Sequence, residues 1–227
     1  MDVYFASKVG SSTYNLQLES SDIDIACITD IWNTSKHVDG IHFICIPKEE
    51  FVQRILSNNI NPLYLQWLFP KDTIIQCELW NYVFNNRENI IAASKNKVWN
   101  NFINRAKAFQ NDIKHWYPIY PKRIVYSILF YNTIIEYASG RLFAEAFIPD
   151  DSLRDKLLSI RRNDMPVEDV IALNNLYEER ALRCKDFYDE PLDEEFRSQF
   201  EQEVNRLLND LPPIDFESFY NNNFKTQ

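Results

Sequence analysis

The chain has few of the residues on which several protein classes depend. Its 227 residues include only three glycines and four cysteines, and it contains no internal repeat or low-complexity segment. The cysteines show no Cys-x-x-Cys spacing, which argues against a zinc site and against a disulfide framework. They are Cys27, Cys45, Cys77 and Cys184. We therefore expect reduced core thiols and a cytoplasmic location.

Long hydrophobic runs are also missing. The longest apolar stretch, residues 124–138, is interrupted by Asn132 and Glu136 and is too short to span a bilayer, so it predicts a core helix. Asp2 stands where the basic region of a signal peptide would lie, and no cleavage-type segment follows it. The sequence accordingly predicts neither a membrane partner nor a secretory signal.

Basic residues are in the minority. The chain has 33 acidic and 24 basic residues, a formal net charge of −9. An extended grip on double-stranded nucleic acid needs many phosphate contacts, so this charge balance disfavours it. A short RNA end or a protein acceptor remains compatible with such a surface.

The apolar pattern divides the chain into two parts. β-Branched and aromatic runs predict strands at residues 3–6, 23–28, 41–46 and 73–84, with an amphipathic helix at 48–57. Later apolar residues recur every three or four positions and, with capping residues and prolines, predict helices at 99–109, 124–135, 150–160, 166–183 and 193–207. The expected class is α+β: an α/β core in residues 1–90, a helical domain in 91–211 and a loosely held tail in 212–227.

Two short motifs in the first part suggest chemistry. Asp22 and Asp24 are spaced i, i+2 at the start of a predicted strand, so they should point to one face, and paired carboxylates of this kind suit Mg²⁺ or Mn²⁺. Gly10, Ser11 and Ser12 precede them and offer unhindered backbone N–H groups and hydroxyls to phosphate oxygens. Either motif alone is also typical of an ordinary turn or a solvated strand edge. The order strand, Gly-Ser turn, Asp-x-Asp strand is rarer, and it suits a metal-bound nucleoside triphosphate.

These residues resemble the signature of the DNA polymerase beta type nucleotidyltransferase superfamily. The sequence is most similar to its RNA-repair-associated branch, the predicted nucleotidyltransferases of phages and bacteria, in which a Gly-Ser turn precedes Ser-Asp-x-Asp, as at Gly10-Ser11 and Ser21–Asp24. An Asn-Pro pair before an apolar helix matches residues 61–69, and residues 139–162 are similar to the helical half of those proteins. The resemblance covers roughly residues 3–185 and is strongest at the first motif.

The resemblance implies a mixed sheet flanked by helices and a metal-dependent enzyme. Such an enzyme transfers a nucleoside monophosphate from a nucleoside triphosphate to an acceptor hydroxyl and releases pyrophosphate. Asp22 and Asp24 would hold the metal, and the turn at Gly10, Ser11 and Ser12 would hold the triphosphate. Two further residues are candidates for nucleotide contacts: Tyr14, beside a base or ribose, and Lys122, by its motif position.

The sequence departs from the family pattern at the third acidic residue. Superfamily enzymes carry a carboxylate on the next strand, where this chain has His42, while Asp39 lies three residues earlier. One metal ion is then more plausible than two, because two carboxylates balance less of the positive charge of two divalent ions than three carboxylates would. His42 is open to three interpretations: an ordinary strand histidine, a ligand better suited to Mn²⁺ or Zn²⁺, or a base toward the acceptor hydroxyl.

A second departure follows Lys122, where the family's His and Arg are replaced by Tyr126 and Leu129. Three hypotheses result. The chain transfers nucleotide to an RNA end, transfers it to a protein, or is a degenerate member that binds nucleotide or a partner protein without turnover.

Overall fold

A computed structural model describes residues 1–227 except 31–33, 52–72, 76, 112 and 226–227. The fold is α+β, and the chain divides into two compact units. The first unit contains Met1–Thr13, Gln17–Ile90 and Asp193–Gln227, and the second contains Tyr14–Leu16 and Ile91–Leu192. The expected helical domain, residues 91–211, is therefore too long at its end, because its last helix clusters with the sheet.

The first unit is built on a mixed sheet. Its strands are β1 (Asp2–Val9), β2 (Ile23–Thr29), β3 (Thr34–Val38), β4 (Ile41–Pro47), β5 (Thr73–Ile75) and β6 (Ile214–Asp215). The strand order is β3-β4-β2-β1-β5, with β6 also paired to β1. β2 and β4 run parallel, while the other pairs run antiparallel. Its helical segments are η1 (Gly10–Ser12), α3 (Glu78–Ala92), α11 (Glu194–Asp210) and α12 (Phe216–Asn223).

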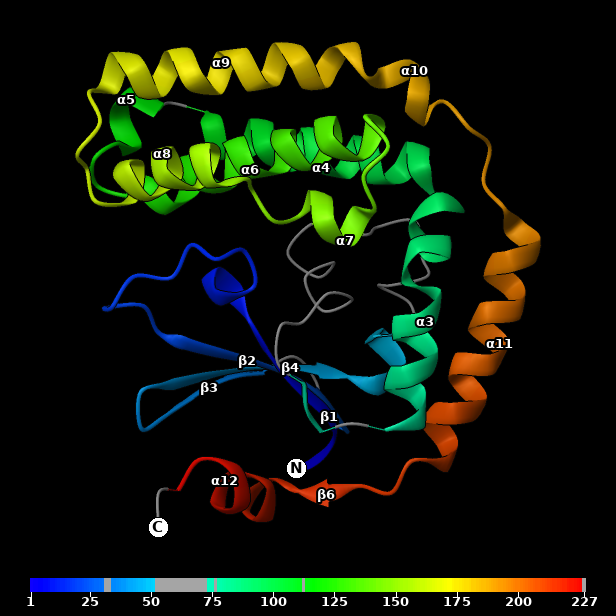
Figure 1. The fold of residues 1–227 in the computed structure, drawn as a ribbon. Helices are drawn as coiled ribbons and strands as arrows, with labels where there is room; N and C mark the ends of the chain where they lie inside the picture. Colours follow the sequence, from blue (N-terminus) through cyan, green and yellow to red (C-terminus); the bar gives the residue numbers. More distant parts are fainter. Residues whose placement is uncertain (31–33, 52–72, 76, 112, 226–227) are drawn as a thin grey trace. The chain divides into compact units, whose positions relative to one another are not determined.

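One face of this sheet is covered by α12 (Figure 1). Phe216 and Phe219 pack edge-on against Phe43 of β4, with ring centroids 5.2 and 6.3 Å apart. Just before the helix, β6 extends the sheet, since Asp215 pairs with Asp2 of β1. The segment expected to be a loose tail thus forms a strand and a helix, because its aromatic residues bury large apolar surfaces on the sheet.

On the other side, α3 and α11 complete the first unit and lie side by side (Figure 1). Trp80 of α3 stacks on Phe5 of β1 at 4.7 Å, and Tyr82 of α3 stacks on Phe200 of α11 at 5.3 Å. The apolar face of α11 is therefore used within the first unit, which explains why the helix clusters with the sheet.

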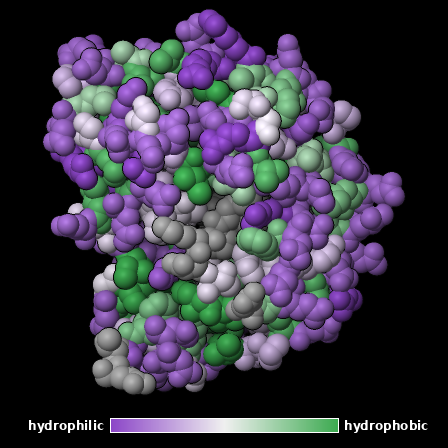
Figure 2. All heavy atoms as spheres, viewed as in Figure 1, coloured by the Kyte–Doolittle hydropathy of each residue, from purple (hydrophilic) through white to green (hydrophobic). Residues whose placement is uncertain are grey.

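The second unit consists of helices. They are α4 (Lys95–Gln110), α5 (Ile113–Trp116), α6 (Pro121–Ala138), α7 (Phe143–Ala146), α8 (Asp151–Arg161), α9 (Val167–Arg183) and α10 (Lys185–Tyr188). Helix α6 contacts α4, α7, α8 and α9 and is buried along most of its length, as expected of a core helix. Asp150 caps α8 by accepting a hydrogen bond from the Leu153 backbone N–H at 2.7 Å. Hydrophilic side chains dominate the face of these helices seen in Figure 2.

Two features of the local structure differ from the predictions, and two predicted helices concern residues outside the described ranges. The strand predicted at 73–84 ends at Ile75, and helix α3 begins at Glu78, because Leu79, Trp80 and Val83 bury at helical spacing. Strand β3 was not expected, since its sequence is mostly polar. The apolar helix predicted after Asn61-Pro62 and most of the helix predicted at 48–57 fall on residues outside the described ranges.

No helix in the described part of the chain combines the length and apolarity needed to cross a membrane.

Candidate functional site

The turn between β1 and β2 brings Gly10 against Asp24. Antiparallel pairing sets Val9 opposite Asp24, so the residue after Val9 lies beside the aspartate side chain. Gly10 has a φ of +78°, a conformation that favours glycine, and a Cβ on it would lie 2.3 Å from Asp24 Oδ2. Glycine is therefore required at position 10 for two reasons: the backbone conformation and the close approach of the Asp24 carboxylate.

The side chains of Ser11 and Ser12 are part of the structure of the turn itself. Ser12 Oγ donates a hydrogen bond to the Val9 carbonyl at 2.9 Å, and Ser11 is almost fully buried. The Thr13 N–H donates to the Gly10 carbonyl at 3.1 Å, which closes the turn. These two hydrogen bonds fix the conformation of the predicted phosphate-binding turn.

His42 lies directly beside Asp24, on the neighbouring parallel strand. The β2–β4 register pairs the two residues, and His42 Nδ1 is 2.8 Å from Asp24 Oδ1. A carboxylate can only accept, so Nδ1 carries the proton and, in the neutral imidazole, Nε2 is left as an acceptor. The position where the family pattern predicts a third carboxylate therefore holds an imidazole that is oriented by Asp24.

Strand β3 adds two residues that sequence reasoning missed. Ser35 Oγ lies 2.6 Å from His42 Nε2, and the ring of His37 stacks on that of His42 at 4.3 Å and 4°. The i, i+2 spacing of Ser35 and His37 places them on one face of a strand. This i, i+2 spacing is the feature of the sequence that could have identified the two residues. It indicates the site only when the pairing of β3 with β4 is known.

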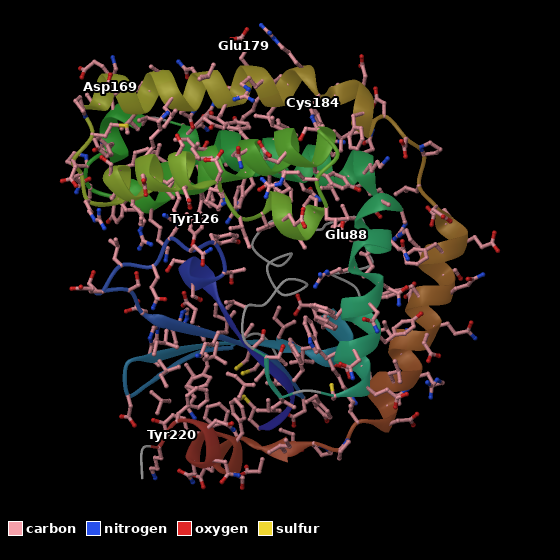
Figure 3. All side chains as sticks on the ribbon, in the orientation of Figure 1. Glu88, Tyr126, Asp169, Glu179, Cys184 and Tyr220 are labelled. Carbon is pink, nitrogen blue, oxygen red and sulfur yellow. The ribbon has the colours of Figure 1, made fainter. Side chains whose placement is uncertain are left out.

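Among the described residues, Asp24 does not belong to a cluster of three metal-ligating side chains. Asp22 is exposed and precedes β2, while Asp39 lies at the β3–β4 turn with a φ of +49°. Tyr220 donates its hydroxyl hydrogen to Asp39 Oδ2 at 2.5 Å (Tyr220 is labelled in Figure 3), and this bond, with burial, raises the pKa of Tyr220. Within the described residues, no group of three His, Cys, Asp or Glu side chains is arranged to hold a metal ion.

Ile23, between the two aspartates, also differs from expectation. The alternation predicts that it points into the core with Ile25. It is 44% exposed, whereas Ile25 is fully buried. The reason is its position at the first residue of β2, where the sheet ends.

The predicted nucleotide contacts Tyr14 and Lys122 belong to the second unit. Tyr14 is fully buried, stacks on Phe147 at 5.3 Å and meets the edge of Tyr126 at 5.8 Å, so its role is packing rather than contact with a base. Burial raises its pKa well above the usual value. Lys122 is exposed in the first turn of α6, with Nζ 5.9 Å from the ring centroid of Tyr126.

No protein-family model matches this sequence, and no protein of known function in the curated collection matches it significantly.

Proposed function

We propose that the protein is a metal-dependent nucleotidyltransferase that transfers a nucleoside monophosphate from a nucleoside triphosphate to an acceptor hydroxyl and releases pyrophosphate. The observation that carries this proposal is the contact between Gly10 and Asp24. The turn cannot accept a Cβ because the second aspartate of Asp-x-Asp lies against it, and this contact sets a candidate phosphate-binding turn beside a candidate metal ligand. The resemblance to the polymerase beta type superfamily supports the same class.

The residues present fit one divalent ion better than two. Asp22 is exposed and Asp24 keeps 15% of its side chain exposed, so both offer carboxylate oxygens to Mg²⁺ or Mn²⁺. Asp39 is already engaged by Tyr220. When bound, the ion would neutralise charge on the phosphates and on the leaving pyrophosphate.

The chain's own residues would then position and activate the reactants. Backbone N–H groups of the turn at Gly10, Ser11 and Ser12 would hold the triphosphate. His42 is oriented through Nδ1 by Asp24, and its Nε2, which lies 2.6 Å from Ser35 Oγ, would accept a proton from the acceptor hydroxyl. An acceptor hydroxyl bound at that nitrogen would give up its proton as its oxygen attacks the α-phosphorus.

The acceptor is an RNA end or a protein side chain in this proposal. A net charge of −9 favours a short contact over an extended grip on a duplex. The cysteines are free thiols, and Cys27 and Cys45 are buried, which supports the proposal of a cytoplasmic location.

The test is label transfer from each α-labelled nucleoside triphosphate in the presence of Mg²⁺ or Mn²⁺, with RNA or protein extract as acceptor. Transfer by the wild type that is lost in Asp24→Asn would support the proposal. Glu217→Gln, which removes an acidic group on α12 outside the site, is the matched control and should transfer normally. No transfer with any nucleotide and either metal would overturn the proposal.

A second candidate is a degenerate nucleotidyltransferase that binds nucleotide or a partner without turnover. The observation that favours it is the His42–Asp24 contact, which occupies one oxygen of a proposed metal ligand in place of a third carboxylate. Isothermal titration with nucleoside triphosphates separates the two: tight binding without label transfer indicates the degenerate protein.

A further inference from the structure

Ser35, His42 and Asp24 form a continuous hydrogen-bonded chain across three neighbouring strands. Ser35 Oγ is 2.6 Å from His42 Nε2, and His42 Nδ1 is 2.8 Å from Asp24 Oδ1. With Nδ1–H donated to the carboxylate, the neutral ring accepts the serine hydroxyl hydrogen at Nε2. This is the pattern of contacts that makes a serine hydroxyl nucleophilic: a base within hydrogen-bond reach, and a third group that orients the base.

The surroundings hold the imidazole in this orientation. His37, directly opposite His42 in the β3–β4 register, stacks on it with nearly parallel rings. Asp24 is in turn fixed by the β1–β2 pairing and by Gly10, whose missing Cβ leaves room for the carboxylate. The base and its orienting group are therefore positioned by the sheet itself.

Ser35 is reachable from solvent. It is exposed and lies on β3, the edge strand of the sheet as far as it is described. An edge strand leaves alternate backbone N–H groups unused by sheet pairing. Backbone N–H groups are also the kind of donor that stabilises the oxyanion formed when a serine attacks an ester.

We propose that Ser35 is a nucleophilic serine that attacks activated carboxylic esters, a second activity that requires neither nucleotide nor metal. Ser35 Oγ forms a bond to the acyl carbon while its proton passes to His42 Nε2. The alcohol then leaves with that proton, and water hydrolyses the acyl-serine to release the acid and restore the hydroxyl. The activity goes beyond nucleotidyl transfer and uses Asp24 as the group that orients His42.

The test is covalent labelling by a fluorophosphonate probe in EDTA, where Ser35 Oγ displaces fluoride from phosphorus. Peptide mass spectrometry should find the adduct on Ser35, and Ser35→Ala should remove it. Asp24→Asn should slow labelling by at least about tenfold, because positioned acid–base groups contribute about 10²- to 10⁴-fold. The matched control is Ser139→Ala, which removes an exposed serine hydroxyl at the end of α6 and should label like the wild type.

The esterase activity itself is measured with 4-nitrophenyl acetate under the same conditions, and its loss in Ser35→Ala is expected. Absence of labelling, or labelling that persists in Ser35→Ala, would overturn the proposal. Because Ser35 is exposed, circular dichroism of the alanine variant should match the wild type, so that a negative result reflects chemistry. Nucleotidyl transfer is measured separately, in the label-transfer assay above. The absence of one activity therefore does not affect the interpretation of the other assay.

Discussion

At the scale of single residues, Gly10 and Gly40 differ in one respect that can be measured. Their φ angles are +78° and +79°, so an alanine meets the same backbone penalty at both positions. Only at Gly10 does the added Cβ meet another group, Asp24 Oδ2, at 2.3 Å, while at Gly40 nothing lies within 4 Å.

Gly10→Ala is therefore expected to lower the free energy of unfolding by more than Gly40→Ala. The backbone penalty common to both is about 1 kcal/mol, and displacement of the carboxylate adds roughly 1–3 kcal/mol at Gly10. Urea denaturation of both variants measures the difference. Equal losses of stability would show that the turn relaxes away from Asp24.

The site residues were predictable to different extents. Gly10 and Asp24, which lie together, follow from short spacings in the sequence, and His42 follows from its place on the next predicted strand. The role of Asp22 stays a prediction. Ser35 could not be predicted, because nothing local in a polar five-residue strand reveals that it will pair beside His42. Tyr14 was misjudged for a related reason: its burial depends on Phe147 and Tyr126, which lie far away in the sequence.

At the scale of elements, a polar network ties three helices of the second unit together. Gln110 at the end of α4 accepts hydrogen bonds from Tyr131 of α6 and Asn174 of α9, each at 2.8 Å. It also donates to Glu178 of α9 at 2.9 Å. Tyr131 and Asn174 are fully buried, so their donors have no access to water.

Replacing Gln110 by Leu is expected to destabilise the helical unit by about 2–6 kcal/mol, because two buried donors lose their acceptor and each costs about 1–3 kcal/mol. Thermal unfolding followed by far-ultraviolet circular dichroism measures the loss. Asn100→Leu, an exposed amide on the same helix, is the control and should change stability little. A small effect at Gln110 would mean that water replaces the missing acceptor.

The same network makes stability sensitive to alkaline pH. Burial, and then the charge of Glu178, raises the pKa of Tyr131 above the value of about 10 expected in the unfolded chain. The unfolded state therefore loses its phenol proton first, so stability is unchanged below about pH 10 and falls as pH rises above it. Urea unfolding across that range should show a shallower decline in Tyr131→Phe; an unchanged decline would contradict this assignment.

Helix α12 stabilises the sheet through its aromatic residues. Phe219 is 1% exposed and contacts Phe43 of β4. Phe219→Ala should cost about 3–5 kcal/mol, the range for a buried phenylalanine. Phe84→Ala, which removes a phenylalanine that is 38% exposed on α3, should cost less than half as much in the same denaturation experiment. A loss at Phe219 that is small and no larger than the loss at Phe84 would contradict this role of α12.

At the scale of the whole molecule, the first unit is assembled from distant segments of the chain. Residues 193–227 supply α11, β6 and α12, which pack on α3 and the sheet formed by the first 90 residues. The Phe216 N–H also donates to the Met1 carbonyl at 3.0 Å, which joins the two ends of the sequence. The intervening residues 91–192 form the helical unit.

A fragment of residues 1–90 is therefore expected to remain unfolded or insoluble when produced alone, because one face of its sheet and part of α3 lose their cover. Co-production with residues 193–227 should yield a soluble complex that co-purifies. Circular dichroism and size-exclusion chromatography provide the measurement. A fragment 1–90 that folds alone would show that the C-terminal elements are accessory.

The sequence by itself determined the α+β class, most helices of the second unit, the first strands and the pairing of a glycine turn with Asp-x-Asp. These features depend on spacings of two to four residues, which set the exposure of side chains along one strand or helix. Tertiary structure alone decided that β3 brings Ser35 to His42, that Asp39 binds Tyr220, and that residues 193–227 return to the sheet. Each of these depends on contacts between segments far apart in sequence. A local sequence pattern does not predict such contacts, because their free energy depends on both segments.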